Sequence, residues 1–157
     1  MSRLVSTRGA QLALAFVLLI GLGGAGSARG IGDLDPKAIK ITLPNDIKWT
    51  KTAASERAVL YGDPAKPGYY VILVKWLPHN NSRPHFHPND RYIQVLSGTW
   101  WVQTGGKYDP AGFKPIPAGS FVVHTAHEVH YDGAKDEPAL IMISGMGPDT
   151  SQQAEQK

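Results

Sequence analysis

Residues 85–98 read His85-Phe86-His87-Pro88-Asn89-Asp90-Arg91-Tyr92-Ile93-Gln94-Val95-Leu96-Ser97-Gly98. Residues two apart in a β-strand face the same side of a sheet, so His85 and His87 project one way and Phe86 the other. Two imidazoles on one face can take adjacent positions around a metal ion, and a third from another strand would complete the set. The His-x-His spacing also occurs on solvated strands by chance, so the spacing alone leaves both interpretations open.

The histidines of the chain fall into two groups. The first holds His79, His85 and His87, and the second holds His124, His127 and His130. Imidazole suits zinc, iron, copper and nickel. A shared metal site is one reason for such clustering.

Short β-rich segments, separated by turn residues such as Ser97-Gly98 and Gly105-Gly106, follow the first 30 residues. The expected strands are residues 39–43, 47–50, 58–61, 69–77, 92–96, 99–103, 120–124 and 139–144. No segment after the first 30 residues shows helical periodicity of useful length. The pattern favours an all-β fold, either a sandwich or a closed barrel.

Residues 85–98 resemble the first motif of the cupin family, which has the form His-x-His, three or four residues, Glu, six residues, Gly. Both histidines, the Val-Leu-x-Gly turn and the spacing match. The second cupin motif has the form Gly, five residues, Pro-x-Gly, two residues, His. It aligns with Gly119, with Thr125-Ala126-His127 in place of Pro-x-Gly, and with His130. The resemblance covers about half the chain, from Tyr69 to Gly145.

The resemblance implies both the fold and the metal ligands. It implies an all-β, antiparallel jelly-roll β-barrel with a metal inside, near one mouth. The ligands that it carries over are His85, His87 and His130, and the implied cofactor is a divalent metal ion, with zinc and iron the first choices. Histidines that are merely hydrogen-bonded in the core are the alternative.

The family's Glu ligand falls on Arg91 in this chain. A guanidinium is permanently charged and has no lone pair to offer, so Arg91 cannot bind a metal. Ile93 and Val95 share its parity, which points Arg91 inward, whereas a shifted register would turn Asp90 inward together with Gln94. An inward Arg91 predicts a three-histidine site with open positions, where the guanidinium could hold an anionic substrate group.

Three residues are candidates for contacting a substrate or for hydrogen-bonding to the metal ligands: Arg91, His127 and Gln94. The alternative for Arg91 is an ion pair with Asp90 or Glu128 at the barrel rim. His127 stands at the family's turn glycine, so it is a fourth ligand, a proton-transfer group or an exposed turn residue. No catalytic residue can be assigned from the sequence.

Two other histidines and a tryptophan pair have structural interpretations. His124 ends an expected strand, and His79 lies in a polar loop with no suggested partner. Trp100 and Trp101 are adjacent on a strand and face opposite sides, so one packs in the core while the other lines a pocket or a dimer face. The expected assembly is a homodimer.

The chain of 157 residues fits one domain. Residues 1–28 have the features of a secretory signal peptide, because two arginines precede an apolar run and small residues end at Ala28. The run is shorter than the roughly 20 apolar residues that span a bilayer, which favours cleavage over membrane anchoring. The expected organisation is a signal peptide, a cupin barrel over residues 29–148 and a disordered tail over residues 149–157.

Composition narrows the partners and the location. The absence of cysteine removes disulfides and thiolate ligands. Cleavage would remove Arg3 and Arg8 and leave 14 basic residues against 13 acidic ones, which gives no case for a nucleic-acid partner. The expected protein is periplasmic or secreted, with no stable membrane anchor after cleavage.

Three function classes stay open, because the cupin fold hosts many unrelated activities. The first is a metal-dependent oxygenase acting on a small, anionic molecule, since three histidines with open positions suit iron. The second is a non-catalytic module that binds a metal or a small ligand. Residues 60–64 and 84–92 are similar to the cupin domains of zinc-binding anti-sigma factors, which suits this second class. The third is an isomerase or lyase of sugars or sugar acids, in which Arg91 would hold a carboxylate.

Overall fold

The structure, a computed structural model, describes residues 34–154, which fall into two compact units that divide after Lys40. The described part of the first unit is a short segment with a turn at Asp35. The predicted signal peptide, residues 1–28, lies outside the described residues. Within residues 34–154, no helix is both long and apolar enough to cross a membrane.

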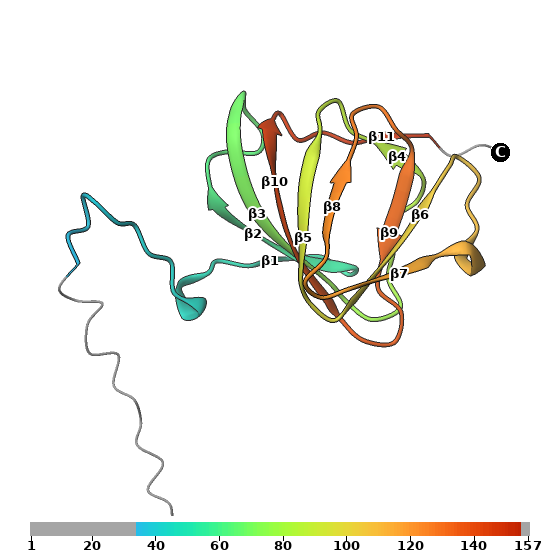
Figure 1. The fold of residues 1–157 in the computed structure, drawn as a ribbon, viewed down its shortest axis with the longest axis horizontal. Coiled ribbons are helices and arrows are strands. Elements are labelled where there is room, and N and C mark those ends of the chain that lie inside the picture. Colours follow the sequence, from blue (N-terminus) through green and yellow to red (C-terminus); the bar gives the residue numbers. More distant parts are fainter. Residues whose placement is uncertain (1–33, 155–157) are drawn as a thin grey trace, which may run out of the picture. The chain divides into compact units, whose positions relative to one another are not determined.

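The second unit consists of two antiparallel sheets (Figure 1). The larger sheet has the strand order β1 (Thr50–Lys51), β2 (Ser55–Tyr61), β3 (Gly68–Trp76), β10 (Ala139–Gly147), β5 (Arg91–Ser97) and β8 (Phe121–His124). The smaller sheet has the order β11 (Gln152–Gln153), β4 (His85–Phe86), β9 (His130–Gly133), β6 (Thr99–Thr104) and β7 (Lys114–Pro117). Two 3-10 turns, η1 (Pro44–Asp46) and η2 (Pro110–Gly112), complete the described elements. The expected all-β jelly-roll class is confirmed.

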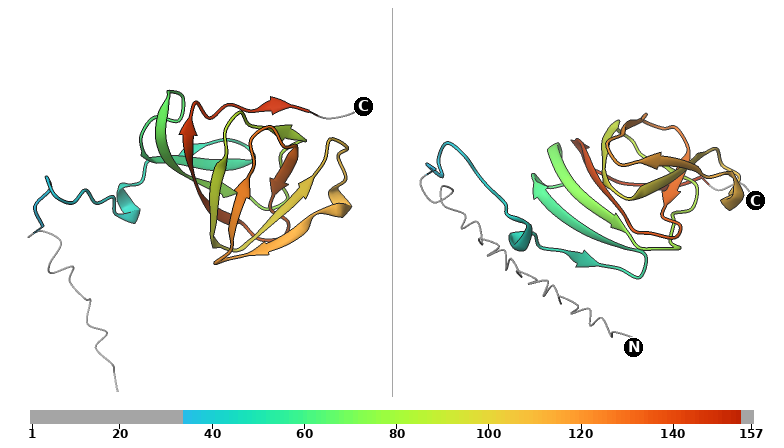
Figure 2. Two further views of the ribbon diagram at one scale, coloured as in Figure 1. Left: turned by 45° about the horizontal axis from the view of Figure 1, so that its top comes forward. Right: turned by 60° about the horizontal axis from the view of Figure 1, so that its bottom comes forward.

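The core lies between the two sheets, which face each other in the views of Figure 2. Alternation along β5 buries Ile93 and Val95 and exposes the residues between them. These side chains pack with Ile141 of β10 and with Trp100 of β6, which is fully buried. Truncation of Trp100 to alanine would cost about 3–5 kcal/mol of folding stability, the usual value for a large buried aromatic.

The adjacent tryptophans separate as the alternation predicts. Trp100 joins the core, and Trp101 lines a surface pocket where the ammonium of Lys135 lies 3.8 Å from the centre of its ring. The turn at Gly98 also follows the motif, because its φ is +72° and a Cβ there would meet the Pro138 carbonyl.

Several strands differ from the sequence expectation. Residues 39–43 alternate like a strand, but they pair with no strand among the described residues, and Ile39 and Ile41 are exposed. Conversely, β7 forms despite Pro115 and Pro117, because it is an edge strand that pairs with β6 alone. Strand β9 forms despite Asp132 and Gly133, residue types that strands usually avoid.

The end of the chain also differs from the expected disordered tail. Residues 149–154 run beside β4, where Gln153 of β11 pairs with His85 (Figures 1 and 2). The amide of Ala154 donates to the Pro84 carbonyl at 2.9 Å, and the amide of Asp149 donates to the Pro64 carbonyl at 2.6 Å. We call residues 149–154 the C-terminal segment. Its order comes from backbone hydrogen bonds, which a polar composition does not exclude.

Candidate metal centre

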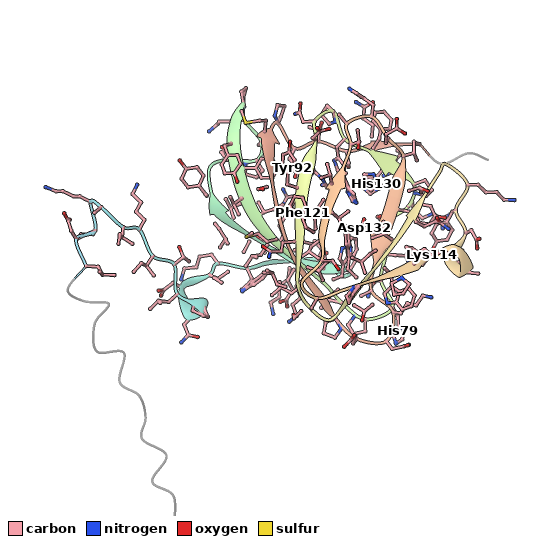
Figure 3. All side chains as sticks on the ribbon, viewed as in Figure 1. His79, Tyr92, Lys114, Phe121, His130 and Asp132 are labelled. Carbon is pink, nitrogen blue, oxygen red and sulfur yellow. The ribbon has the colours of Figure 1, made fainter. Side chains whose placement is uncertain are left out.

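Three histidines from neighbouring strands of the smaller sheet meet inside the barrel. His85 lies on β4, and His87 follows two residues later. His130, labelled in Figure 3, begins β9 and pairs with His85. One ring nitrogen of each lies within 4.8 Å of the others. All three residues are buried, with exposed fractions of 4–7%. We call these three residues the histidine cluster, and they are the residues that the motifs predicted as metal ligands.

Backbone carbonyls fix the tautomer of each cluster histidine. The Nδ1 atoms donate to carbonyl oxygens: His85 to Arg83 at 2.8 Å, His87 to Thr150 at 2.8 Å, and His130 to Glu128 at 3.0 Å. A carbonyl can only accept, so each Nδ1 carries a proton, and in the neutral ring Nε2 then keeps its lone pair. Nε2 of His87 and of His130 is buried and has no hydrogen-bond partner among residues 34–154. A metal-binding histidine usually donates the N–H of its other ring nitrogen to a carbonyl or carboxylate oxygen, as these three do.

Burial favours the uncharged form of two of these histidines, His87 and His130. Burial, reinforced by the positive charge of Arg91, lowers the pKa of His87 to about 4. Burial also lowers the pKa of His130 to about 4, against the opposing effect of Asp132. Neutral imidazole is the form that binds metal ions.

His124, at the end of β8, is the opposite tautomer, with its proton on Nε2. Its ring centre lies 3.7 Å from that of His130, and its Nδ1 accepts from Nη2 of Arg91 at 3.3 Å. Because a guanidinium only donates, the lone pair of His124 is on Nδ1 and the proton is on Nε2. Burial lowers the pKa of His124 strongly, and the neighbouring His130 and Arg91 lower it further. His124 therefore supports Arg91 and has no Nε2 lone pair for a metal.

Arg91 points into the barrel, as the alternation along β5 predicted. Its side chain is 10% exposed, and its Nη1 lies 3.4 Å from Oδ1 of Asp149. The other oxygen of Asp149 accepts from Nη2 of Arg57 on β2 at 2.8 Å. A buried carboxylate thus lies between two guanidinium groups. This charge also helps burial to raise the pKa of the Tyr70 hydroxyl to about 12.

Asp90 and Gln94 do not reach the cluster. Asp90 is exposed, and its carboxylate accepts from the amide of Ala126 at 2.7 Å. Gln94 is exposed on the outer face of β5, opposite in parity to Arg91. The alternative register with Asp90 inward is therefore wrong, and Gln94 lies where it cannot contact the metal ligands.

His127 and His79 also lie outside the cluster. His127 is exposed, with a φ of +66° that matches the turn glycine of the motif, and its ring packs beside Phe86. These features favour the exposed turn residue over a fourth ligand. His79 lies at the other end of the barrel from His130 (Figure 3).

A cavity of about 280 Å³ opens beside the cluster. One part of its wall is polar and holds His85, His87, Arg57, Arg91 and Asp149. Another part is apolar and holds Val74, Ile141, Ile143 and the indole of Trp76. Among the residues that line this cavity, the buried donors Nε of Arg91 and Nε1 of Trp76 have no hydrogen-bond partner within residues 34–154. Unpaired buried donors are costly, so the cavity is suited to a molecule with acceptor oxygens.

Asp132 also lines the cavity, and both of its carboxylate oxygens accept hydrogen bonds from other side chains of the protein. Oδ2 accepts from Nε1 of Trp100 at 2.9 Å, and Oδ1 accepts from the hydroxyl of Ser82 at 3.1 Å. Asp132 therefore links β9 to the core and to the loop before β4.

Sequence reasoning missed three residues of the candidate site. Asp149 and Thr150 lie in the expected tail, and no sequence pattern connects them to Arg91 or to His87. Trp76 is different, because it continues the inward parity of the expected strand at residues 69–77 and could have been found from that alternation.

Comparisons with known proteins agree with this architecture. The sequence matches no protein-family model, and no curated protein is significantly similar to it. The fold is similar to that of the polyketide cyclase RemF from Streptomyces resistomycificus, with a TM-score of 0.62, 14% identity and coverage of 76% of this chain and 87% of that one. It is also similar to the DMSP lyase DddQ from Ruegeria pomeroyi, with a TM-score of 0.56, 16% identity and coverage of 71% and 64%.

A cupin-2 domain protein from Rhodospirillum rubrum is similar as well, with a TM-score of 0.54, 16% identity and coverage of 73% and 78%. At such identities the similarity shows the fold alone. The chain therefore has the cupin fold, as its two motifs predicted.

Proposed function

We propose that this chain is an exported, metal-dependent cupin enzyme that acts on a small, oxygen-bearing molecule in the cavity beside the histidine cluster. The observation that carries the proposal is the set of three buried imidazoles whose Nδ1–H groups are fixed by carbonyls. Their Nε2 lone pairs are left for one ion. The reaction class that we favour is oxygenation, because three histidines with open positions suit iron.

The donor set fits a divalent metal ion. Two buried Nε2 atoms without partners would be costly in a site that never binds anything. The residues that would hold the ion are His85, His87 and His130, whose ligand nitrogens lie within 4.8 Å of one another. When bound there, the metal supplies Lewis acidity, and iron would add redox chemistry with dioxygen.

The cavity wall would bind and orient the substrate. Acceptor oxygens of the substrate, such as those of a carboxylate, would satisfy Nε–H of Arg91 and Nε1–H of Trp76. The side chains of Val74, Ile141 and Ile143 would contact an apolar part of the same molecule and exclude water from it. The substrate class that follows is a small molecule with an oxygen-rich end and an apolar end.

An isomerase or lyase that depends on a protein carboxylate as base has less support. The two acidic side chains that line the cavity are Asp132 and Asp149, and both are engaged in hydrogen bonds or ion pairs. Their oxygens already accept hydrogen bonds from Trp100, Ser82 and the two arginines, so they are not free to take a proton from a substrate. The described residues thus favour chemistry at the metal over protein acid–base chemistry.

The test is the metal content of protein purified from its exported location without added metal. About one equivalent of iron, together with dioxygen uptake in the presence of small oxygen-bearing compounds, would support the oxygenase. Zinc alone would favour the non-catalytic binding module, because zinc is redox-inert. Absence of any bound metal, and failure to bind cobalt or zinc when these are added, would refute the proposal.

Export and a homodimer belong to the same proposal. Residues 1–28 support export through their signal-peptide pattern. The outer face of the larger sheet supports a homodimer, because Tyr92 and Phe121 stack there with ring centres 6.5 Å apart and are 45% and 67% exposed (Figure 3). Light scattering of the wild type and of Phe121→Asp would test the dimer, and a monomeric wild type would refute it.

A further inference from the structure

The candidate metal centre contains a positive charge where a cation should bind. The first cupin motif has a carboxylate at the position of Arg91, and the Arg91 guanidinium lies inside the barrel with a 10% exposed side chain. A buried charge is screened much less than an exposed one. An unneutralised Arg91 would therefore weaken the binding of a divalent ion by the histidine cluster.

Asp149 supplies the compensating charge from the C-terminal segment. Its side chain is only 3% exposed, and its Oδ1 lies 3.4 Å from Nη1 of Arg91. The second partner, Arg57, has a 43% exposed side chain, so solvent screens much of its charge. Asp149 is thus the buried carboxylate that pairs with Arg91, whereas the other buried carboxylate of the cavity, Asp132, is held by Trp100 and Ser82.

The carboxylate of Asp149 lies on the outer side of the cluster. Oδ1 of Asp149 lies 3.7 Å from Nδ1 of His87. Nδ1 is the ring nitrogen of His87 that would not bind the metal. The next residue, Thr150, holds that same Nδ1 with its carbonyl oxygen. Asp149 therefore acts on a metal through Arg91 and His87 and is not itself a ligand.

We infer that Asp149 is a positioning residue, which holds Arg91 and cancels its charge so that the histidine cluster can bind a divalent ion without the usual fourth carboxylate ligand. The inference rests on the proposed function, since it concerns the metal affinity of the same cluster. It goes further by assigning a role in the site to a residue that lies outside both cupin motifs.

The test is the dissociation constant for cobalt(II), measured on full-length mature protein by competition with a chelating dye. Asp149→Asn keeps the shape of the side chain and removes its charge, and we expect the dissociation constant to rise about 10- to 100-fold, the range found for residues that support metal ligands. Asp149→Glu, which keeps the charge, should bind cobalt more tightly than Asp149→Asn.

Two double variants separate a charge effect from a general loss of structure. Adding Arg91→Gln to Asp149→Asn removes the uncompensated buried charge and should restore most of the lost affinity. Adding Arg57→Gln instead is the matched control, and it should restore little because Arg57 is largely solvated. A merely structural role of Asp149 would leave both double variants equally weak.

Each outcome bears on one of the two ideas. If the wild type does not bind cobalt, the proposed function and this inference both fail. If the wild type binds cobalt and Asp149→Asn binds it equally well, the inference alone fails. Should Asp149→Asn not fold, the single variant Arg91→Gln decides, because the inference requires it to bind cobalt at least as tightly as the wild type, and weaker binding would overturn it.

Discussion

Acidification should destabilise the metal-free protein through its buried histidines. The pKa of His87 falls from 6.5 to about 4 on folding, chiefly because the ring is buried. The unfolded chain therefore binds a proton at this ring as the pH falls below about 6.5, while the folded protein does not until about pH 4. Stability that is fully present above pH 6.5 is lost as the pH falls toward 4.

The size of the effect follows from the shift. At about 1.36 kcal/mol per pKa unit, His87 alone should cost the folded state about 2–3 kcal/mol between pH 7 and pH 4.5. His130, whose pKa is lowered to about the same value, should contribute a similar amount. Such losses are a large part of the total stability of a domain of this size, which is typically 5–15 kcal/mol.

Urea unfolding in the presence of a chelator, at several pH values, measures the loss directly. His87→Asn keeps a donor for the Thr150 carbonyl but cannot take up a proton, so its unfolding free energy should fall less between pH 7 and pH 4.5 than that of the wild type. The difference should be about 2–3 kcal/mol. An unchanged pH dependence in His87→Asn would refute the reasoning.

Three further predictions concern the metal and the processing of the chain. Alanine substitution of any member of the histidine cluster should lower metal content sharply in elemental analysis, while His79→Ala, at the other end of the barrel, should leave it unchanged. Arg91→Glu should tighten metal binding and weaken the binding of carboxylates, whereas Asp90→Ala should change neither, as measured by titration; equal effects from both would contradict the observed register. Mass spectrometry of exported protein should show cleavage between Ala28 and Arg29, and an intact Met1 terminus in the membrane fraction would contradict it.

The fold and the cluster were predictable because both depend on local patterns. The alternation along residues 91–95 fixes which side chains face the core, and it placed Arg91 inward correctly. The His-x-His pair is joined to His130 by the direct pairing of β4 with β9. Two motifs in the right order were enough to anticipate that contact.

Strand assignments failed where tertiary contacts decide. β7 contains two prolines and still forms, since its outer edge needs no backbone donor. β9 buries His130 and Asp132, polar residues that a strand keeps only if they find partners, and Trp100 and Ser82 supply those of Asp132. No local property of residues 130–133 reveals those partners.

The distribution of charge around the cluster links these observations. A carboxylate at the position of Arg91 would lie on β5 and would need no help from a distant part of the chain. In this protein the carboxylate nearest to the cluster comes from Asp149, 58 residues after Arg91, in a segment whose polar composition predicts disorder. If Asp149 compensates Arg91 as we infer, the two residues form one functional unit, in which the arginine is compatible with a metal only while the C-terminal segment is in place. It follows that a related chain with Glu at the position of Arg91 has no need of Asp149, so that its C-terminal segment is free to differ in sequence.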